Sequence, residues 1–134
     1  MLFVPCAPYS LRPLFGRTIM SALETFEKML AQGKDSAMLR FSLGNECHKA
    51  ARLEDAMAHL QAALALDARY SAAWKLLGKV QVEATQPEQA LQTYRQGIAV
   101  AQEKGDLQAV KEMQVFAKRL EKQLGAAVPP AGAA

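Results

Sequence analysis

Two segments of this 134-residue chain repeat one another at a fixed offset of 34 positions. The offset joins Leu43 to Leu77, Gly44 to Gly78, Ala50 to Ala84, Glu54 to Glu88, Ala56 to Ala90 and Ala65 to Ala99. A period of this length is typical of stacked supersecondary units, none of which can bury its apolar face alone. The chain is therefore expected to form a repeat array, which offers an extended surface rather than a catalytic pocket.

The composition indicates one small folded domain. Apolar residues make up 51% of the chain and charged residues 22%, which is enough to build a core and too few charges for a disordered chain. The net charge is +3, but Arg12 and Arg17 lie in residues 1–19, which hold no acid, so the rest carries +1 (14 basic minus 13 acidic). This balance does not favour duplex nucleic acid as a ligand. No run approaches the ~18 apolar residues of a membrane span.

The chain divides into three parts. Residues 1–19, broken by three prolines, are predicted to be a disordered extension, and Met20 is a candidate start of the natural chain. A cleaved transit sequence is the alternative interpretation of this segment. Residues 20–124 are expected to form the repeat domain, and residues 125–134 a disordered tail. The two cysteines, Cys6 and Cys47, indicate no disulfide framework, which fits a reducing, cytoplasmic compartment.

Apolar residues recurring every three to four positions predict helices and no strand. The expected helices span residues 21–32, 36–50, 53–66, 71–84, 87–103 and 106–124. Thr85 and Glu88 have the spacing of a capping box, and Gly105 followed by Asp106 is typical of a helix stop and a new N-cap. Gly44 and Gly78 fall inside helices, where glycine costs roughly 1 kcal/mol relative to alanine, so each is expected to allow a close helix contact.

We expect those glycines to face Ala56 and Ala90 on the second helix of each pair. Leu60 and Tyr94 are then expected to fill the space toward the next pair.

The spacing resembles that of the tetratricopeptide repeat, W-x-x-L-G-x-x-Y followed by A-x-x-x-F-x-x-A and P. The second copy supplies Trp74, Leu77, Gly78, Ala90, Tyr94 and Gly97, and the first supplies Leu43, Gly44, Ala56, Leu60 and Ala63. Residues 37–104 cover two full copies. The segment 21–32 resembles the second half of a degenerate repeat, and 106–124 resembles a capping helix. The pattern departs from the family at Arg40, Cys47, Gln81 and Ala68.

The resemblance implies an all-α solenoid of antiparallel helix pairs whose first helices line a concave groove. Mapped onto this chain, the groove positions are Met38, Phe41, Asn45, His48, Lys49, Ala72, Lys75, Lys79, Val82 and Glu83. Asn45, Lys75 and Lys79 resemble part of the clamp with which co-chaperone members grip a terminal carboxylate, although Phe41 stands where a lysine is expected. A carboxylate needs charged and neutral donors converging on it. The alternative is a solvated helix face of mixed charge.

Met38, Phe41 and Val82 suggest an apolar seat for a partner side chain, or, for the first two, packing against helix 21–32. The sequence offers no nucleophile with a general base and an orienting group in a catalytic arrangement, and no spacing of metal ligands. We therefore expect no catalytic residue, small-molecule substrate, cofactor or metal site. His48 is either a pH-sensitive groove contact or an ordinary surface histidine.

The sequence therefore predicts a cytoplasmic adaptor, scaffold or co-chaperone-like module that binds a peptide segment or C-terminus of another protein. Two alternatives stay open. One is self-association into a structural homo-oligomer whose groove binds no partner. The other is weak RNA binding through the basic face of the last helix, made by Lys111, Lys118, Arg119 and Lys122.

Overall fold

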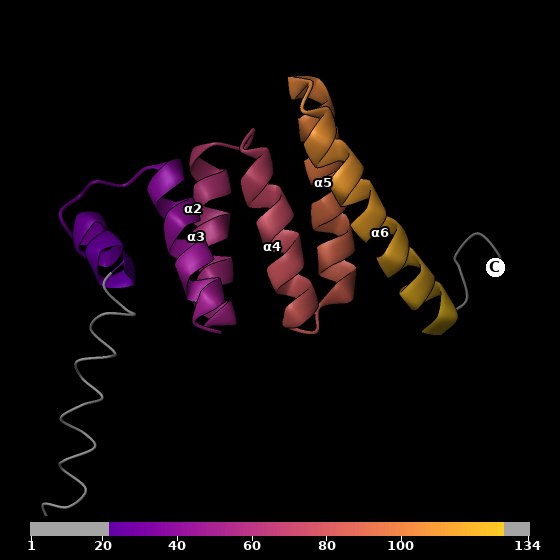
Figure 1. Ribbon diagram of the computed structural model, residues 1–134, viewed down its shortest axis with the longest axis horizontal. Coiled ribbons are helices and arrows are strands. Elements are labelled where there is room, and N and C mark those ends of the chain that lie inside the picture. The colour runs from indigo at the N-terminus through magenta and orange to yellow at the C-terminus, as the bar shows by residue number, and fades with distance from the viewer. Residues whose placement is uncertain (1–21, 128–134) are drawn as a thin grey trace, which may run out of the picture.

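The computed structural model describes residues 22–127, so the expectations for 1–19 and for 128–134 lie outside the described residues. Within this range the chain is all-α, as predicted. A helix at residues 22–31 is followed by α2 (Ala37–Lys49), α3 (Leu53–Leu66), α4 (Ser71–Glu83), α5 (Pro87–Lys104) and α6 (Leu107–Ala127). The helices stand side by side in chain order, each antiparallel to the next (Figure 1). The fold is the expected row of helix pairs.

The helix bounds follow the predictions closely, except at the C-terminal end. The segment 53–66 is α3 as predicted, and most other ends differ by one residue. Helix α6 runs to Ala127, so residues 125–127, which we assigned to the tail, are helical. Alanine is the strongest helix former, and Ala126 and Ala127 extend the helix past Gly125.

Two helix starts are capped by side chains. The Ser36 hydroxyl accepts a hydrogen bond from the Leu39 amide of α2 (3.1 Å), and the Asp106 carboxylate accepts one from the Ala109 amide of α6 (3.2 Å). Asp106 also accepts a hydrogen bond from the Ser71 hydroxyl (2.9 Å), and these bonds lower the pKa of its carboxyl group. The capping box expected at Thr85 is wrong: Gln86 is the N-cap of α5, and Thr85 belongs to the end of α4.

Four helices end in the same hydrogen-bonded turn, with one residue in the left-handed conformation. In α2 the Ala51 amide bonds to His48 O and the Arg52 amide to Cys47 O, and α4 repeats these two bonds 34 residues later. The left-handed residue is a glycine after two of the four helices, at Gly33 and Gly105. At the other two it is Ala51 (φ 61°) or Thr85 (φ 59°), where a Cβ atom is unfavourable.

The interior contacts are made by glycines that receive large side chains. A Cβ atom on Gly44 would lie 2.7 Å from Leu60 Cγ, and one on Gly78 would lie 2.5 Å from Tyr94 Cε1. Gly97 receives Trp74 Cβ and Met113 Sδ in the same manner, both at 2.7 Å from a Cβ placed there. These glycines let α2 approach α3, and α4 approach α5, at short distance.

The expected partners of the glycines were therefore only partly right. Leu60 and Tyr94 fill the space beside Gly44 and Gly78 within their own helix pair, although Tyr94 also stacks on Phe116 of the next helix. In the helix at residues 22–31, Leu23 is buried (3% exposed) and Ala22 is exposed.

Replacing either non-glycine turn residue should stabilise the fold. Ala51→Gly and Thr85→Gly are each expected to raise the free energy of unfolding by about 1 kcal/mol, because the left-handed conformation costs a Cβ-bearing residue that much. Urea unfolding monitored by circular dichroism measures the change. Gly105→Ala is the matched control and should lower stability; equal stability of all three variants would contradict the assignment of backbone strain.

Gly78→Ala should destabilise the protein by about 1–2 kcal/mol even though alanine favours helices, because the Tyr94 ring is held by Phe116 and cannot retreat. Gly125→Ala is the control: no other group lies within 4 Å of a Cβ there, so the same change should be neutral or stabilise by up to about 1 kcal/mol. Thermal unfolding of both variants tests the contact. A more stable Gly78→Ala variant would refute it.

Candidate functional site

The groove helices α2, α4 and α6 border two adjoining hollows. The first, which we call the central hollow, has a volume of about 360 Å³. Its lining residues are Phe41, Asn45, Ala72, Lys75, Leu76, Lys79, Glu112 and Phe116. Five of the predicted groove residues thus line one hollow: Phe41, Asn45, Ala72, Lys75 and Lys79. They come from α2 and α4, as the resemblance implied.

The second, which we call the distal hollow, has a volume of about 430 Å³ and lies between α4, α5 and α6. Its lining residues are Lys79, Val82, Glu83, Tyr94, Phe116, Arg119, Leu120 and Gln123. Lys79 and Phe116 line both hollows, so the two lie next to each other, and we refer to them together as the groove. Each is within the range of about 300–1,000 Å³ typical of ligand sites.

Three predicted groove residues, His48, Lys75 and Glu83, take part in polar side-chain contacts between groove helices. Lys75 Nζ of α4 lies 3.2 Å from Glu112 Oε1 and 3.3 Å from Glu112 Oε2 of α6. His48 Nε2 of α2 lies 2.7 Å from Glu83 Oε2 of α4. Lys75 therefore already has a carboxylate partner, which weakens its similarity to a clamp residue waiting for a ligand.

The other predicted residues are more dispersed. Lys49 is exposed and pairs with Glu46 of its own helix (3.2 Å), and Met38 is 71% exposed and lines neither hollow. Phe41 packs on Tyr70, with 5.1 Å between ring centroids, while Val82 (39% exposed) lies in the distal hollow. The three apolar residues therefore do not form one patch, and the aromatic partner of Phe41 is Tyr70, which lies outside the helix at residues 22–31.

Helix α6 supplies groove residues that we did not predict. Glu112, Phe116 and Arg119 are spaced four and three residues apart, so they share one face of the helix, and that face borders the groove. The repeat period contained the signal, because Phe116 follows Val82 by 34 residues. We assigned Arg119 to the basic outer face with Lys111, Lys118 and Lys122, whereas its side chain lies over the Phe116 ring, 5.9 Å from the centroid.

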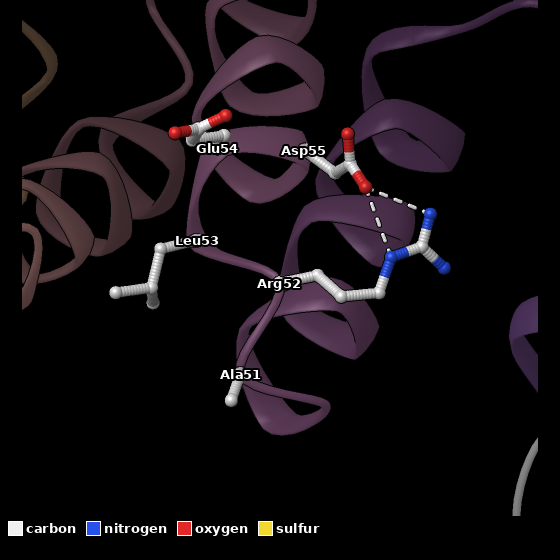
Figure 2. A pocket seen from close by; sticks show the side chains of 5 residues that line it. All are labelled: Ala51, Arg52, Leu53, Glu54 and Asp55. Carbon is white, nitrogen blue, oxygen red and sulfur yellow. Dashed lines mark hydrogen bonds and ion pairs between the residues drawn. The ribbon is translucent and has the colours of Figure 1, made fainter.

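A third hollow, of about 370 Å³, lies at the turn between α2 and α3 and is lined by Ala51, Arg52, Leu53, Glu54 and Asp55. Figure 2 shows Arg52 and Asp55 directed toward one another, while Leu53 and Glu54 point away from that pair. The Arg52–Asp55 ion pair measures 2.8 Å, and both side chains are about half exposed. One short segment lines this hollow, and Arg52 and Asp55 pair with each other, so it is a feature of the turn.

The two remaining chemically active side chains have structural surroundings. Cys47 is fully buried, and burial raises the pKa of its thiol, which keeps it protonated and inert. His59 Nδ1 lies 3.3 Å from Arg40 Nη1, and Arg40 in turn is paired with Asp35. Burial, together with the Arg40 charge, lowers the pKa of His59, so its ring is neutral near pH 7.

Across residues 22–127, no helix has both the length and the apolar character to cross a membrane.

Tyr94 forms the wall shared by the core and the distal hollow. It is 2% exposed, and its ring stacks on Phe116 with 5.6 Å between centroids. Burial, and secondarily the charge of Glu83, raises the pKa of its hydroxyl to about 12. The hydroxyl is therefore neutral at physiological pH, and this wall of the hollow carries no charge of its own.

An array of helix hairpins whose alternate helices border a groove defines the class of helical-repeat interaction proteins. Residues 48–113 match the sequence profile of the tetratricopeptide repeat. The TPR repeat-containing protein PA0015 of Pseudomonas aeruginosa is 47% identical over 100 residues, which are 75% of this chain and 95% of that protein. The chain therefore belongs to the tetratricopeptide repeat family, a family of protein-interaction modules.

Solved structures agree with this assignment. Protein BPP2914 from Bordetella parapertussis is 43% identical, with a TM-score of 0.69 over 78% of this chain and 90% of that one. The TPR2B domain of yeast Sti1, solved in a complex with pHsp70, has a TM-score of 0.73 over 92% of this chain and 99% of that one. Its sequence identity is 14%, so that likeness concerns the fold.

The raised pKa of Tyr94 predicts a loss of stability in alkali. Because the folded-state pKa (about 12) exceeds the ordinary value near 10, its contribution is fully present below pH ~10 and is lost as the pH rises through 12. Tyr94→Phe cannot ionise, so the urea midpoint of this variant should fall less than that of wild type between pH 9 and pH 11.5. Parallel decreases in both proteins would contradict this role of Tyr94.

Proposed function

We propose that this protein is an adaptor that binds an extended segment of a partner protein in the groove of α2, α4 and α6. The single observation that carries the proposal is that two hollows adjoin along Lys79 and Phe116. Adjoining hollows lined by both apolar and polar side chains suit a polypeptide, which offers side chains and backbone groups in alternation.

Several features of the groove support a peptide as the ligand. Asn45 and Lys79 offer a neutral and a charged donor on adjacent helices, while Phe41, Leu76 and Phe116 supply apolar surface between them. The groove helices are held by the His48–Glu83 and Lys75–Glu112 ion pairs, so the partner meets a preformed surface. A domain of the same fold in yeast Sti1 forms a complex with pHsp70. The buried thiol of Cys47 favours a reducing compartment such as the cytoplasm.

The obvious test variant, Lys75→Glu, is unsuitable because it would place a second carboxylate beside Glu112 and disturb the packing of α4 on α6. We therefore choose Asn45→Arg with Lys79→Glu, the groove variant. The matched control is Gln92→Arg with Lys118→Glu, which makes the same chemical changes at exposed positions of α5 and α6 that line neither hollow.

Affinity capture from extracts of the native cell, read by quantitative mass spectrometry, compares these proteins with wild type. Partners captured by wild type and by the control should fall at least tenfold with the groove variant, while circular dichroism shows all three equally helical. Equal recovery by the groove variant would remove the groove from the proposal.

Sedimentation of wild type at tens of micromolar should show a monomer, and a stable oligomer would favour the structural alternative.

A further inference from the structure

The distal hollow combines an apolar lining with Lys79 and Arg119, two cations that form no ion pair within residues 22–127. We propose that it is the anchor pocket for an apolar side chain of the partner, with an acidic side chain next to it in the partner sequence. This inference rests on the proposed groove function and names the kind of segment that the groove binds.

The floor of the distal hollow is apolar and rigid. Val82, Tyr94, Phe116 and Leu120 line it, and the two rings stack on each other. Tyr94 and Leu120 are 2% and 4% exposed, so core packing fixes their positions, whereas Val82 is 39% exposed. Apolar groups held in a hollow lose no conformational entropy when a ligand covers them, and such pockets receive the anchor residues of protein partners.

Two cations border this floor without a carboxylate partner. Lys79 and Arg119 form no ion pair with any side chain of residues 22–127, and Arg119 instead lies over the Phe116 ring. Elsewhere in the groove, Lys75 is paired with Glu112. The acid of the distal hollow, Glu83, is paired with His48. In the lining of the distal hollow the two cations outnumber Glu83, so its formal charge is positive.

This combination fits an acidic, apolar polypeptide segment. A carboxylate beside the anchor would reach the Arg119 guanidinium or the Lys79 ammonium in a charge-assisted hydrogen bond. Consecutive residues of an extended chain advance about 3.3–3.6 Å each, so the acid is expected within two positions of the anchor. A nucleic acid fits less well, because the Glu83 carboxylate lines the distal hollow and would repel phosphates.

The experiment is a selection from a library of random 12-residue peptides whose C-termini are fused to the display carrier, so no terminal carboxylate is present. Peptides enriched on wild type should carry a large apolar residue with Asp or Glu within two positions. A synthetic, amidated copy should bind at least tenfold more weakly to Arg119→Glu and to Val82→Asp. It should bind within twofold of wild type to Lys118→Glu and Lys111→Glu, which change the outer face of the same helix.

A charge exchange separates recognition from misfolding. The same peptide with its acid replaced by lysine should bind Arg119→Glu better than it binds wild type, which a merely unfolded variant cannot do. Two results would overturn the anchor pocket and leave the groove function standing. One is that the enriched peptides lack acidic residues. The other is that their affinity is unchanged by Arg119→Glu but falls with Asn45→Arg. No groove-dependent peptide at all would overturn both. Oligouridylate binding that Arg119→Glu abolishes, without peptide binding, would replace this inference with nucleic-acid recognition.

Discussion

The arrangement of the whole array depends on one contact, in which a large side chain of the second helix occupies the space above a glycine of the first. Leu60 over Gly44 and Tyr94 over Gly78 are the two copies of this contact. It brings each helix pair together closely enough that the outer side chains interlock and leave little interior volume. The 34-residue period is the spacing at which this contact, and the turn that follows each first helix, recur along the chain.

The same contact links the core to the groove. Tyr94 fills the space at Gly78 with one edge of its ring and stacks on Phe116, which lines both hollows. Leu60, the equivalent residue one repeat earlier, is fully buried in the first of the two core clusters. Where α6 closes the array, the groove therefore has a floor of two stacked rings, and core packing of Tyr94 fixes the position of that floor.

Much of the fold could be predicted from the sequence because a repeated contact leaves a repeated pattern. The Leu-Gly pairs and the apolar periodicity gave all six described helices and their pairing. The Thr85 error arose because the residues before Pro87 have the composition of a helix start, while the hydrogen bonds of α4 use them as a helix end. Local chemistry was ambiguous there, and packing decided it. Ala51 occupies the same position one period earlier and also ends a helix in the left-handed conformation, so the repeat itself indicated that Thr85 ends α4.

The candidate site was less predictable, because side chains on an exposed helix face choose partners across helices that are far apart in sequence. Asn45, Lys75 and Lys79, which the spacing assigned to the groove, all line the central hollow, and the structure adds that Lys75 is paired with a carboxylate of α6. Such contacts join α2 to α4 through His48 and Glu83, and α4 to α6 through Lys75 and Glu112. Under our proposal, Lys79 and Arg119 supply the electrostatic selectivity for a partner, since a paired charge offers a ligand little net attraction.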